Sequence, residues 1–244
     1  MATRTRRPER REEPLSRAGI VGAAIELLDS AGEGGLTFRA LGERLSTGPG
    51  ALYWHVANKG ELLAAATDAV VTAALTVGPA GDPASPRDEI HAVALGLFHA
   101  VEEHPWLAPQ LSAQLSRSPW GSVAPRIFES VGRRIRALGV PEGSWFTATS
   151  VLVHYILGAA GQNAANTAHA RTLGPDADRA KFLDTVSRAW EQLDADDYPF
   201  TRAVAKQLRE HDDREQFLAG IDLALAGITA PRPSGDEAVA PPTG

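Results

Sequence analysis

The sequence predicts an all-α fold, and three observations lead to that prediction. Apolar residues recur three and four positions apart in one segment after another, which is the spacing that buries one face of a helix. No segment shows the alternation of apolar and polar residues that is typical of a half-buried strand. Capping residues, prolines and glycines separate the segments, as they do where helices begin and end. We therefore expect a chain that is built from helices alone.

The first helix is expected to follow a polar arm. Residues 1–14 hold five arginines and three glutamates, and we interpret them as a disordered basic arm. The arm is either a phosphate or minor-groove contact or a solubilising tail. Ser16 is a suitable N-cap for a helix to about Ala31, and the glycine-rich residues 32–35 end it. Its buried stripe is expected to consist of Ile20, Ala23, Ala24, Leu27 and Leu28.

Two short helices are expected next, on either side of a tight turn. Thr37 is a good N-cap for the first of them. Residues 46–48 break that helix, and Gly48 is able to take a positive φ. Pro49 then suits the first position of a second helix to Val56, because its missing N–H is not needed there. Asn58 caps the following helix, and Glu61 is the expected partner in a capping box.

The second short helix is expected to expose aromatic rings. Leu52 and Val56 are four residues apart and point inward. The outward positions are then filled by Tyr53, Trp54 and His55. An exposed patch of this kind usually marks a contact surface, although the rings could instead pack on a neighbouring domain. A short helix after a four-residue turn, with cations on both sides, is the arrangement of a helix-turn-helix motif.

Residues 52–59, LYWHVANK, resemble the recognition-helix signature of the tetracycline-repressor (TetR) family. The likeness runs without a gap from about residue 15 to residue 63. The family consists of dimeric, all-helical transcription regulators that bind operator DNA with an N-terminal helix-turn-helix and a small ligand with a C-terminal domain. The resemblance implies contact with operator DNA through Thr37, Arg39, Pro49, Gly50, Ala51, Tyr53, Trp54, His55 and Lys59. At Pro49, Gly50 and Ala51 the side chains differ from the family motif. Arg39 suits a guanine edge, and Lys59 suits a phosphate.

A second domain is expected at residues 84–229, after the 15–63 helix-turn-helix domain. The last helix of the first domain runs to about residue 77, and the proline- and glycine-rich residues 78–86 follow. Residues 230–244 are rich in proline and glycine and are interpreted as a disordered tail. Helices are expected in the second domain near residues 90–103, 106–115, 125–138, 142–167, 177–193, 200–211 and 212–228.

Two helices of this domain resemble the dimerisation helices of the tetracycline repressor itself. The similar segments are residues 154–158 and 217–227, and the resemblance implies a homodimer through helices 142–167 and 212–228. Both helices are apolar, with small residues that allow close approach. The expected contact residues are Ala148, Leu152, Tyr155 and Ala159 on one helix and Phe217, Ile221, Ala224 and Leu225 on the other. The alternative is that both are ordinary core helices of a monomer.

The resemblance also implies a ligand site, with one departure. In the tetracycline repressor a histidine binds the magnesium of the chelated drug, and a glutamate of the other subunit assists. Here those positions hold Leu111 and Gln162, and neither can anchor a hydrated cation well. We therefore expect a small, largely apolar effector. The residues expected to contact it are Leu97, Trp106, Phe128, Val131, Phe146, Thr149 and Gln162, although a buried aromatic residue is more often core than ligand contact.

Composition and motifs narrow the choice of partner, cellular location and chemistry. The net charge is −6, yet residues 1–60 hold nine Lys and Arg against seven Asp and Glu, so the basic end is the helix-turn-helix end. The chain lacks cysteine and has no apolar run near 18 residues, which suits a cytoplasmic protein without membrane contact. His99 and Glu103 lie four residues apart on one helical face, with His104 adjacent, so a metal site is conceivable, but no third ligand falls at metal spacing. No nucleophile elbow or phosphate-binding glycine loop is present, so we do not expect an enzyme or a cofactor.

The sequence thus predicts a homodimeric, DNA-binding transcriptional regulator, expected to be a repressor that a small apolar ligand releases. The alternative is a ligand-independent or architectural DNA-binding protein. Operator, effector and regulated genes do not follow from the residues.

Overall fold

We analysed a computed structural model, which describes residues 15–76, 78, 85–117, 120–172 and 179–230. The basic arm expected at residues 1–14 lies outside the described residues, and so does all but the first residue of the tail expected at 230–244. Within the described ranges every regular element is a helix, so the all-α prediction is confirmed. None of these helices is long and apolar enough to cross a membrane.

The chain divides into two compact units, Met1–Ala69 and Val70–Gly244. The first unit holds α1 (Arg17–Gly35), α2 (Phe38–Arg44), α3 (Pro49–Tyr53) and the first part of α4 (Lys59–Leu75). Ser16 caps α1 by accepting a hydrogen bond from the Gly19 N–H at 3.1 Å. Gly32 interrupts the helical backbone of α1 with a φ of 63°, so the helix loses its regular course where the sequence predicts its end. The core of this unit consists of Ile20, Ala23, Ala24, Leu28, Leu36, Leu41, Leu52, Val56, Leu62, Leu63 and Ala66.

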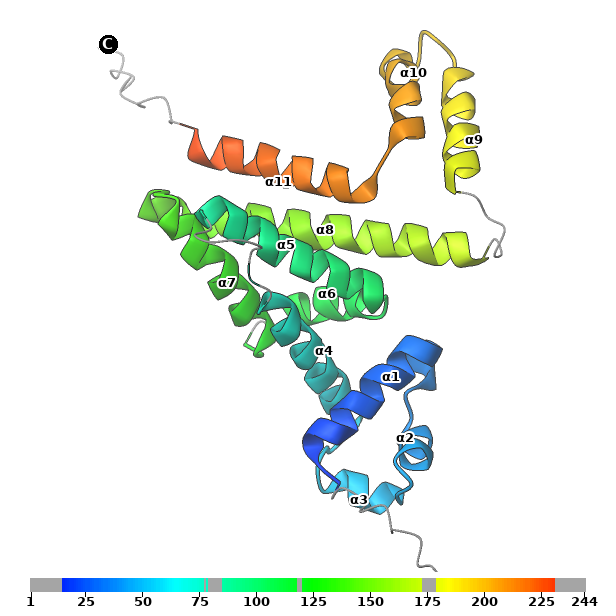
Figure 1. The fold of residues 1–244 in the computed structure, drawn as a ribbon, viewed down its shortest axis with the longest axis vertical. Coiled ribbons are helices and arrows are strands. Elements are labelled where there is room, and N and C mark those ends of the chain that lie inside the picture. The colour runs from blue at the N-terminus through cyan, green and yellow to red at the C-terminus, as the bar shows by residue number, and fades with distance from the viewer. Residues whose placement is uncertain (1–14, 77, 79–84, 118–119, 173–178, 231–244) are drawn as a thin grey trace, which may run out of the picture. The chain divides into compact units, whose positions relative to one another are not determined.

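In the described residues, the second unit begins with the end of α4 and continues through seven α-helices and two short 3-10 helices (Figure 1). The elements are α5 (Pro86–Glu103), α6 (Leu107–Arg117), α7 (Val123–Ala137), η1 (Glu142–Ser144), α8 (Trp145–Thr172), α9 (Arg179–Glu191), α10 (Pro199–Val204), η2 (Ala205–Glu210) and α11 (Asp213–Thr229).

Helix α8 is the centre of the second unit. Helices α5, α6, α7 and α11 all pack against it, and α11 runs along it in Figure 1. Helices α9 and α10, with η2, pack mainly on one another. The hydroxyl of Ser187 donates a buried 2.7 Å hydrogen bond to the carbonyl of Ala205 and ties α9 to η2.

Helix α4 meets α5 at a glycine. A Cβ atom built on Gly96 would lie 2.3 Å from the carbonyl oxygen of Ala74. Real Cβ atoms do not come so close to backbone, so only glycine allows this contact. The C-terminal part of α4 is therefore held directly against the backbone of α5.

Candidate nucleic-acid interface and effector-binding domain

The turn between α2 and α3 is tighter than its sequence indicates. Thr37 caps α2 as expected, because its hydroxyl accepts a hydrogen bond from the Ala40 N–H at 3.1 Å. The positive φ expected at Gly48 is found instead at Ser46, where φ is 51°, whereas Gly48 has a φ of −77°. The residue that needs to be glycine is Gly42, because a Cβ atom there would lie 2.7 Å from a carbonyl oxygen of the turn.

Helix α3 ends at Tyr53, three residues before the predicted end. Leu52 and Val56 are buried, as their spacing predicts. Trp54 is 90% exposed and Tyr53 is 56% exposed. His55 is half-buried, so two of the three rings expected on the outer face are fully presented there.

The first positions of α3 present little side chain. Pro49 and Gly50 are exposed and Ala51 is half-buried. A Cβ atom added at Gly50 would meet nothing within 4 Å. None of these three side chains has a hydrogen-bonding group. Hydrogen bonds to bases from this motif must therefore come from the other expected contact residues.

The two cations expected at the interface already have partners within the unit. Arg39 Nε donates to Glu43 Oε1 at 3.0 Å, although the two side chains are 88% and 67% exposed. Lys59 Nζ donates to the carbonyl of Glu33 at 2.6 Å and so binds the end of α1. Arg39 is thus presented at the surface beside a competing carboxylate, and Lys59 also connects α1 to α4.

The capping box predicted for α4 forms with one change. Asn58 Oδ1 accepts from the Glu61 N–H at 2.9 Å, as expected. The Glu61 carboxylate accepts from the N–H of Ala57 at 2.8 Å rather than from that of Asn58. Arg17 also pairs with Glu61 at 2.8 Å. The start of α4 is therefore held both by the residues just before it and by α1.

Four of the residues expected to contact an effector are buried in the second unit. Leu97, Trp106, Val131 and Thr149 are exposed by no more than 7%. They belong to α5, to the residue that precedes α6, to α7 and to α8, which pack on one another. These four side chains can line an interior site.

The other three expected ligand contacts lie differently. Phe128 is half-buried and stacks on Phe146, with ring centroids 6.1 Å apart. Phe146 is 77% exposed, so it does not line the interior of the single chain. Gln162 is also exposed, and its amide donates to Asn166 Oδ1 at 3.0 Å. The position of Gln162 suits a contribution to a second subunit rather than to its own interior.

The residues expected to join two subunits are mostly covered by the chain's own helices. Five of them are exposed by 5% or less, namely Ala148, Leu152, Phe217, Ile221 and Leu225. They pack α8 and α11 into the second unit, so these five side chains are covered within the single chain. A close approach supports this packing, because a Cβ atom on Gly220 would lie 1.9 Å from the Tyr155 hydroxyl. That hydroxyl donates to the carbonyl of Phe217 at 3.1 Å.

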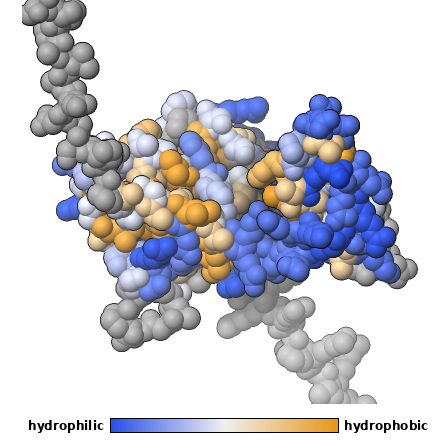
Figure 2. Space-filling view, turned by 90° about the horizontal axis from the view of Figure 1, so that it is seen from above, coloured by the Kyte–Doolittle hydropathy of each residue, from blue (hydrophilic) through white to orange (hydrophobic). Residues whose placement is uncertain are grey.

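The outward faces of the same two helices are apolar. Leu223 on α11 is 76% exposed and Val151 on α8 is 44% exposed. Figure 2 shows the molecule from the α11 side, and apolar surface gathers in the part that α11 crosses. No charged residue occurs in residues 145–170. Within residues 217–230 the one acidic residue is Asp222, which is already bound to α5.

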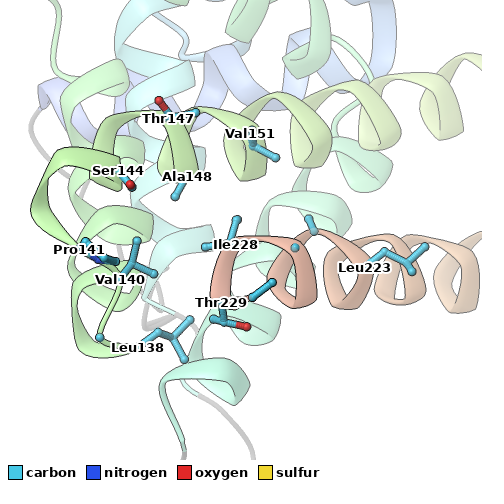
Figure 3. Close-up of a pocket in the computed structure, with 14 residues that line it drawn as sticks. Leu138, Val140, Pro141, Ser144, Thr147, Ala148, Val151, Leu223, Ile228 and Thr229 are labelled. Atoms are coloured by element: carbon cyan, nitrogen blue, oxygen red, sulfur yellow. The ribbon is translucent and has the colours of Figure 1, made fainter. Parts of the chain in front are cut away.

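A pocket of about 610 Å³ lies between the start of α8 and the end of α11 (Figure 3). Its walls come from residues 138–151 and 223–230, and they include Val151 and Leu223. The hydroxyl of Ser144 lines the pocket and is buried without a hydrogen-bond partner among the described residues. The pocket thus continues the apolar outward face.

Two charged contacts join α5 to α7 and to α11. Arg134 on α7 is buried, and its Nε lies 3.0 Å from Glu89 Oε2 on α5. Burial lowers the pKa of the Arg134 guanidinium, while Glu89 opposes that shift. Asp222 on α11 accepts from Arg87 at 2.8 Å and contacts His91 Nε2 at 2.9 Å, both on α5. The hydrogen bond from Arg87 is the main reason why the pKa of Asp222 is lowered.

Sequence reasoning missed these contacts and one more at the DNA-binding surface. Phe38 stacks on Tyr53, with ring centroids 4.4 Å apart and planes at 9°. An aromatic residue directly after an N-cap was the available signal. Among the described residues, no three His, Cys, Asp or Glu side chains gather as a metal site requires.

Comparison with known proteins gives a consistent result over both units. Residues 20–66 match the family described as bacterial regulatory proteins, tetR family. Residues 79–232 match the family described as tetracyclin repressor-like, C-terminal domain.

Two curated relatives are similar over part of their length. An HTH-type transcriptional regulator of Saccharopolyspora erythraea is 35% identical over 158 residues, which is 62% of this chain and 64% of the relative. The HTH-type transcriptional repressor DrrR1 of Streptomyces coeruleorubidus is 33% identical over 156 residues, covering 64% of this chain and 56% of the relative. The matched part of the chain thus spans less than two thirds of both relatives.

Solved structures extend the likeness to nearly the whole chain. The transcriptional regulator SCO7222 of Streptomyces coelicolor is 68% identical with a TM-score of 0.80, covering 88% of this chain and 98% of that one. BioQ in complex with its DNA operator is 28% identical with a TM-score of 0.55, covering 88% and 99%. ActR of Streptomyces coelicolor in complex with actinorhodin shares the fold, at 24% identity and a TM-score of 0.69, covering 88% and 97%.

Proposed function

The chain belongs to the TetR family of bacterial transcriptional regulators, and we propose that it acts as a homodimeric repressor that a small, largely apolar molecule releases from its operator. One observation supports this most strongly: a helix-turn-helix unit with exposed rings is joined through α4 to a helical unit whose interior and outer face are both apolar. The name of DrrR1 and the ligand-bound state of ActR are compatible with repression and with an effector.

Operator contact is assigned to the exposed surface of α2 and α3. Tyr53 and Trp54 present the largest exposed side chains there. Arg39 supplies a planar pair of donors that matches a guanine edge. To reach the base it must leave Glu43, and because an exposed ion pair contributes only about 0.2–1 kcal/mol, DNA can replace it.

Lys59 has a role in positioning as well as in charge. Its bond to the carbonyl of Glu33 fixes the ammonium group at the junction of α1 and α4. An ammonium held there is a point charge for a phosphate and carries no base preference. Replacing Lys59 should therefore weaken binding to all sequences alike.

A subunit contact is assigned to the outward faces of α8 and α11. Leu223 and Val151 are exposed there, and between them lies the pocket of Figure 3. A second copy that packs on this face would cover both residues and provide surroundings for the unpartnered Ser144 hydroxyl. Two-fold symmetry presents the same patch from each subunit. An operator with half-sites in successive major grooves requires the two recognition helices to lie about 34–36 Å apart.

The effector site is assigned to the interior among α5, α6, α7 and α8. The buried members of the expected set are Leu97, Trp106, Val131 and Thr149. Apolar burial would supply most of the affinity, at roughly 25 cal/mol per Å². Leu111 is 1% exposed and has no group that binds a metal, so magnesium chelation is not part of this proposal.

Release from DNA would follow from the contact between α5 and α4. A ligand that shifts α5 also shifts α4, because the backbone of Gly96 lies directly on that of Ala74. Helix α4 continues into the DNA-binding unit. The ligand has to bind the released state more tightly, and a coupling of roughly 1–3 kcal/mol lowers operator affinity about 5–150-fold.

Selection of DNA duplexes from a random pool tests this proposal. The wild-type protein should enrich a two-fold symmetric site, whereas Arg39→Ala should lose about 1–3 kcal/mol on that site and relax one base pair in each half. Binding to random DNA serves as the control. Equal losses on selected and random DNA would contradict the role of Arg39. If no apolar compound lowers affinity for the selected duplex, the protein acts as a ligand-independent DNA binder.

A further inference from the structure

The first residue of α2 and the last residue of α3 face each other ring to ring. Phe38 follows the N-cap Thr37, and Tyr53 ends the recognition helix. Their ring centroids are 4.4 Å apart and the planes are 9° from parallel. Phe38 is half-buried and Tyr53 is 56% exposed, so the stack lies outside the buried core. It connects the two helices of the motif at their surface.

Tyr53 lacks other support. Helix α3 has only five residues, and its N-cap Gly48 makes no side-chain bond to it. Among the described residues the Tyr53 hydroxyl makes no hydrogen bond, so the stack is the interaction that orients the ring. An unrestrained side chain must be immobilised when DNA binds, which weakens binding. A ring that already rests on Phe38 has lost part of that freedom beforehand.

We propose that Phe38 is a positioning residue for DNA binding, which holds the Tyr53 phenol ready for the operator through the ring stack. This inference rests on the proposed contact between Tyr53 and DNA. Phe38 has no donor or acceptor and cannot read a base edge by hydrogen bonding. One face of the Tyr53 ring is covered by Phe38, which leaves the other face and the hydroxyl for the nucleic acid.

Phe38 differs in this respect from the core residues around it. Leu41 and Leu52 of the same two helices are fully buried. Loss of either would leave a cavity and destabilise the unit. Phe38→Leu keeps an apolar side chain at a half-buried position, and it should leave the fold intact while it removes the stack.

A double-mutant cycle on the full-length protein tests the proposal, with the duplex that the wild-type protein selects from a random pool as the probe. The variants are Phe38→Leu, Tyr53→Ala and both together, with Phe38→Tyr as the conservative rescue. Phe38→Leu removes an aromatic pair, so its affinity for the selected duplex should fall by about 2- to 12-fold per half-site. For two half-sites the fall in affinity is about 5- to 150-fold. Phe38→Tyr should bind the duplex with wild-type affinity. The thermal unfolding midpoint of Phe38→Leu should equal that of the wild-type protein.

The combined variant decides between a positioning role and a direct one. If Phe38 acts through Tyr53, then adding Phe38→Leu to Tyr53→Ala should cause no further loss of affinity for the duplex. An equal loss in both backgrounds would show that Phe38 contacts DNA itself and would overturn the inference, as would wild-type affinity of Phe38→Leu. Normal binding by Tyr53→Ala would also overturn it. If the wild-type protein selects no duplex, the proposed function fails together with the inference.

Discussion

Leu223 gives the sharpest test of the proposed subunit contact, because a matched control lies two residues away in the same helix. Leu223 is 76% exposed in the single chain and Leu225 is 1% exposed. We expect Leu223→Asp to separate the subunits and leave each chain folded. Leu225→Asp should instead unfold the second unit, because it places a carboxylate in the core.

The size of the effect follows from the exposed fraction of the side chain. Complete burial of a leucine contributes about 1.5–3 kcal/mol. With 76% left for a partner to cover, each copy contributes roughly 1–2 kcal/mol. Symmetry doubles this to roughly 2–4 kcal/mol, which corresponds to an increase of about 30- to 1,000-fold in the dimer Kd. Desolvation of the new carboxylate adds to that value, so it is a lower bound.

Sedimentation velocity over a dilution series measures this change. Circular dichroism of the same samples separates dissociation from unfolding. Trp54→Asp is a suitable control, because it likewise replaces an exposed apolar side chain with aspartate, but in the DNA-binding unit, where Trp54 is 90% exposed. A wild-type protein that sediments as a monomer at micromolar concentration would refute the reasoning. So would a Leu223→Asp variant that associates like the wild-type protein.

Four further predictions concern other parts of the chain. Gly42→Ala places a Cβ atom 2.7 Å from a backbone oxygen, so thermal unfolding should show a loss of about 1–3 kcal/mol; an unchanged midpoint would contradict the tight turn. Glu43→Gln removes the carboxylate that competes for Arg39, so affinity for random and selected DNA should rise, by at most about fivefold per half-site. The hydrogen bond from Arg87 holds the pKa of Asp222 below its ordinary value of 3.8, so this contact stabilises the fold above that pH and is lost as pH falls below it. In urea unfolding from about pH 5 to about pH 3, Asp222→Asn should therefore lose stability at the upper end and show a weaker pH dependence. Tetracycline with magnesium should not release the selected duplex, and release by micromolar drug in a fluorescence titration would show that the apolar effector site is wrong.

The order of the helices could be predicted because their boundaries are local. Ser16, Thr37 and Asn58 act as caps through their own side chains and the next few backbone N–H groups. Such contacts depend on residues three positions apart and are visible in the sequence. The conformation of the turn between α2 and α3 was harder to predict from the sequence. The positive φ at Ser46 accompanies the close approach of the turn backbone to Gly42.

The faces of α8 and α11 could not be assigned from the sequence. Helix α8 carries apolar or small residues on nearly all sides, so periodicity does not show which side meets the chain's own helices. Leu152 and Leu225 turn inward and Val151 and Leu223 turn outward, although all four are apolar. Only the packing of α5, α7 and α11 around α8 separates the two sets.

In the candidate sites, too, local motifs could be predicted from the sequence, whereas contacts made by packing could not. The residues proposed to face DNA were taken from a contiguous motif, and Tyr53 and Trp54 of that motif are exposed. The stack of Phe38 on Tyr53 joins residues fifteen apart, and the aromatic residue after the N-cap does not indicate which ring it meets. Phe146 looks like a pocket residue in the sequence, but at the second position of α8 it reaches solvent.

In the proposed subunit contact, the scarcity of charge along residues 145–170 of α8 and residues 217–230 of α11 has a consequence for partner choice. Proteins often reject a wrong partner by setting like charges against each other. Residues 145–170 offer no charged side chain for that purpose, and Asp222 is occupied by α5. Over these residues of the proposed contact, discrimination between this chain and a related regulator would then rest on shape, as in the fit of Leu223 to the surface opposite. After duplication of the gene, the two copies could therefore come to form separate dimers through changes in side-chain volume on this face rather than through changes of charge.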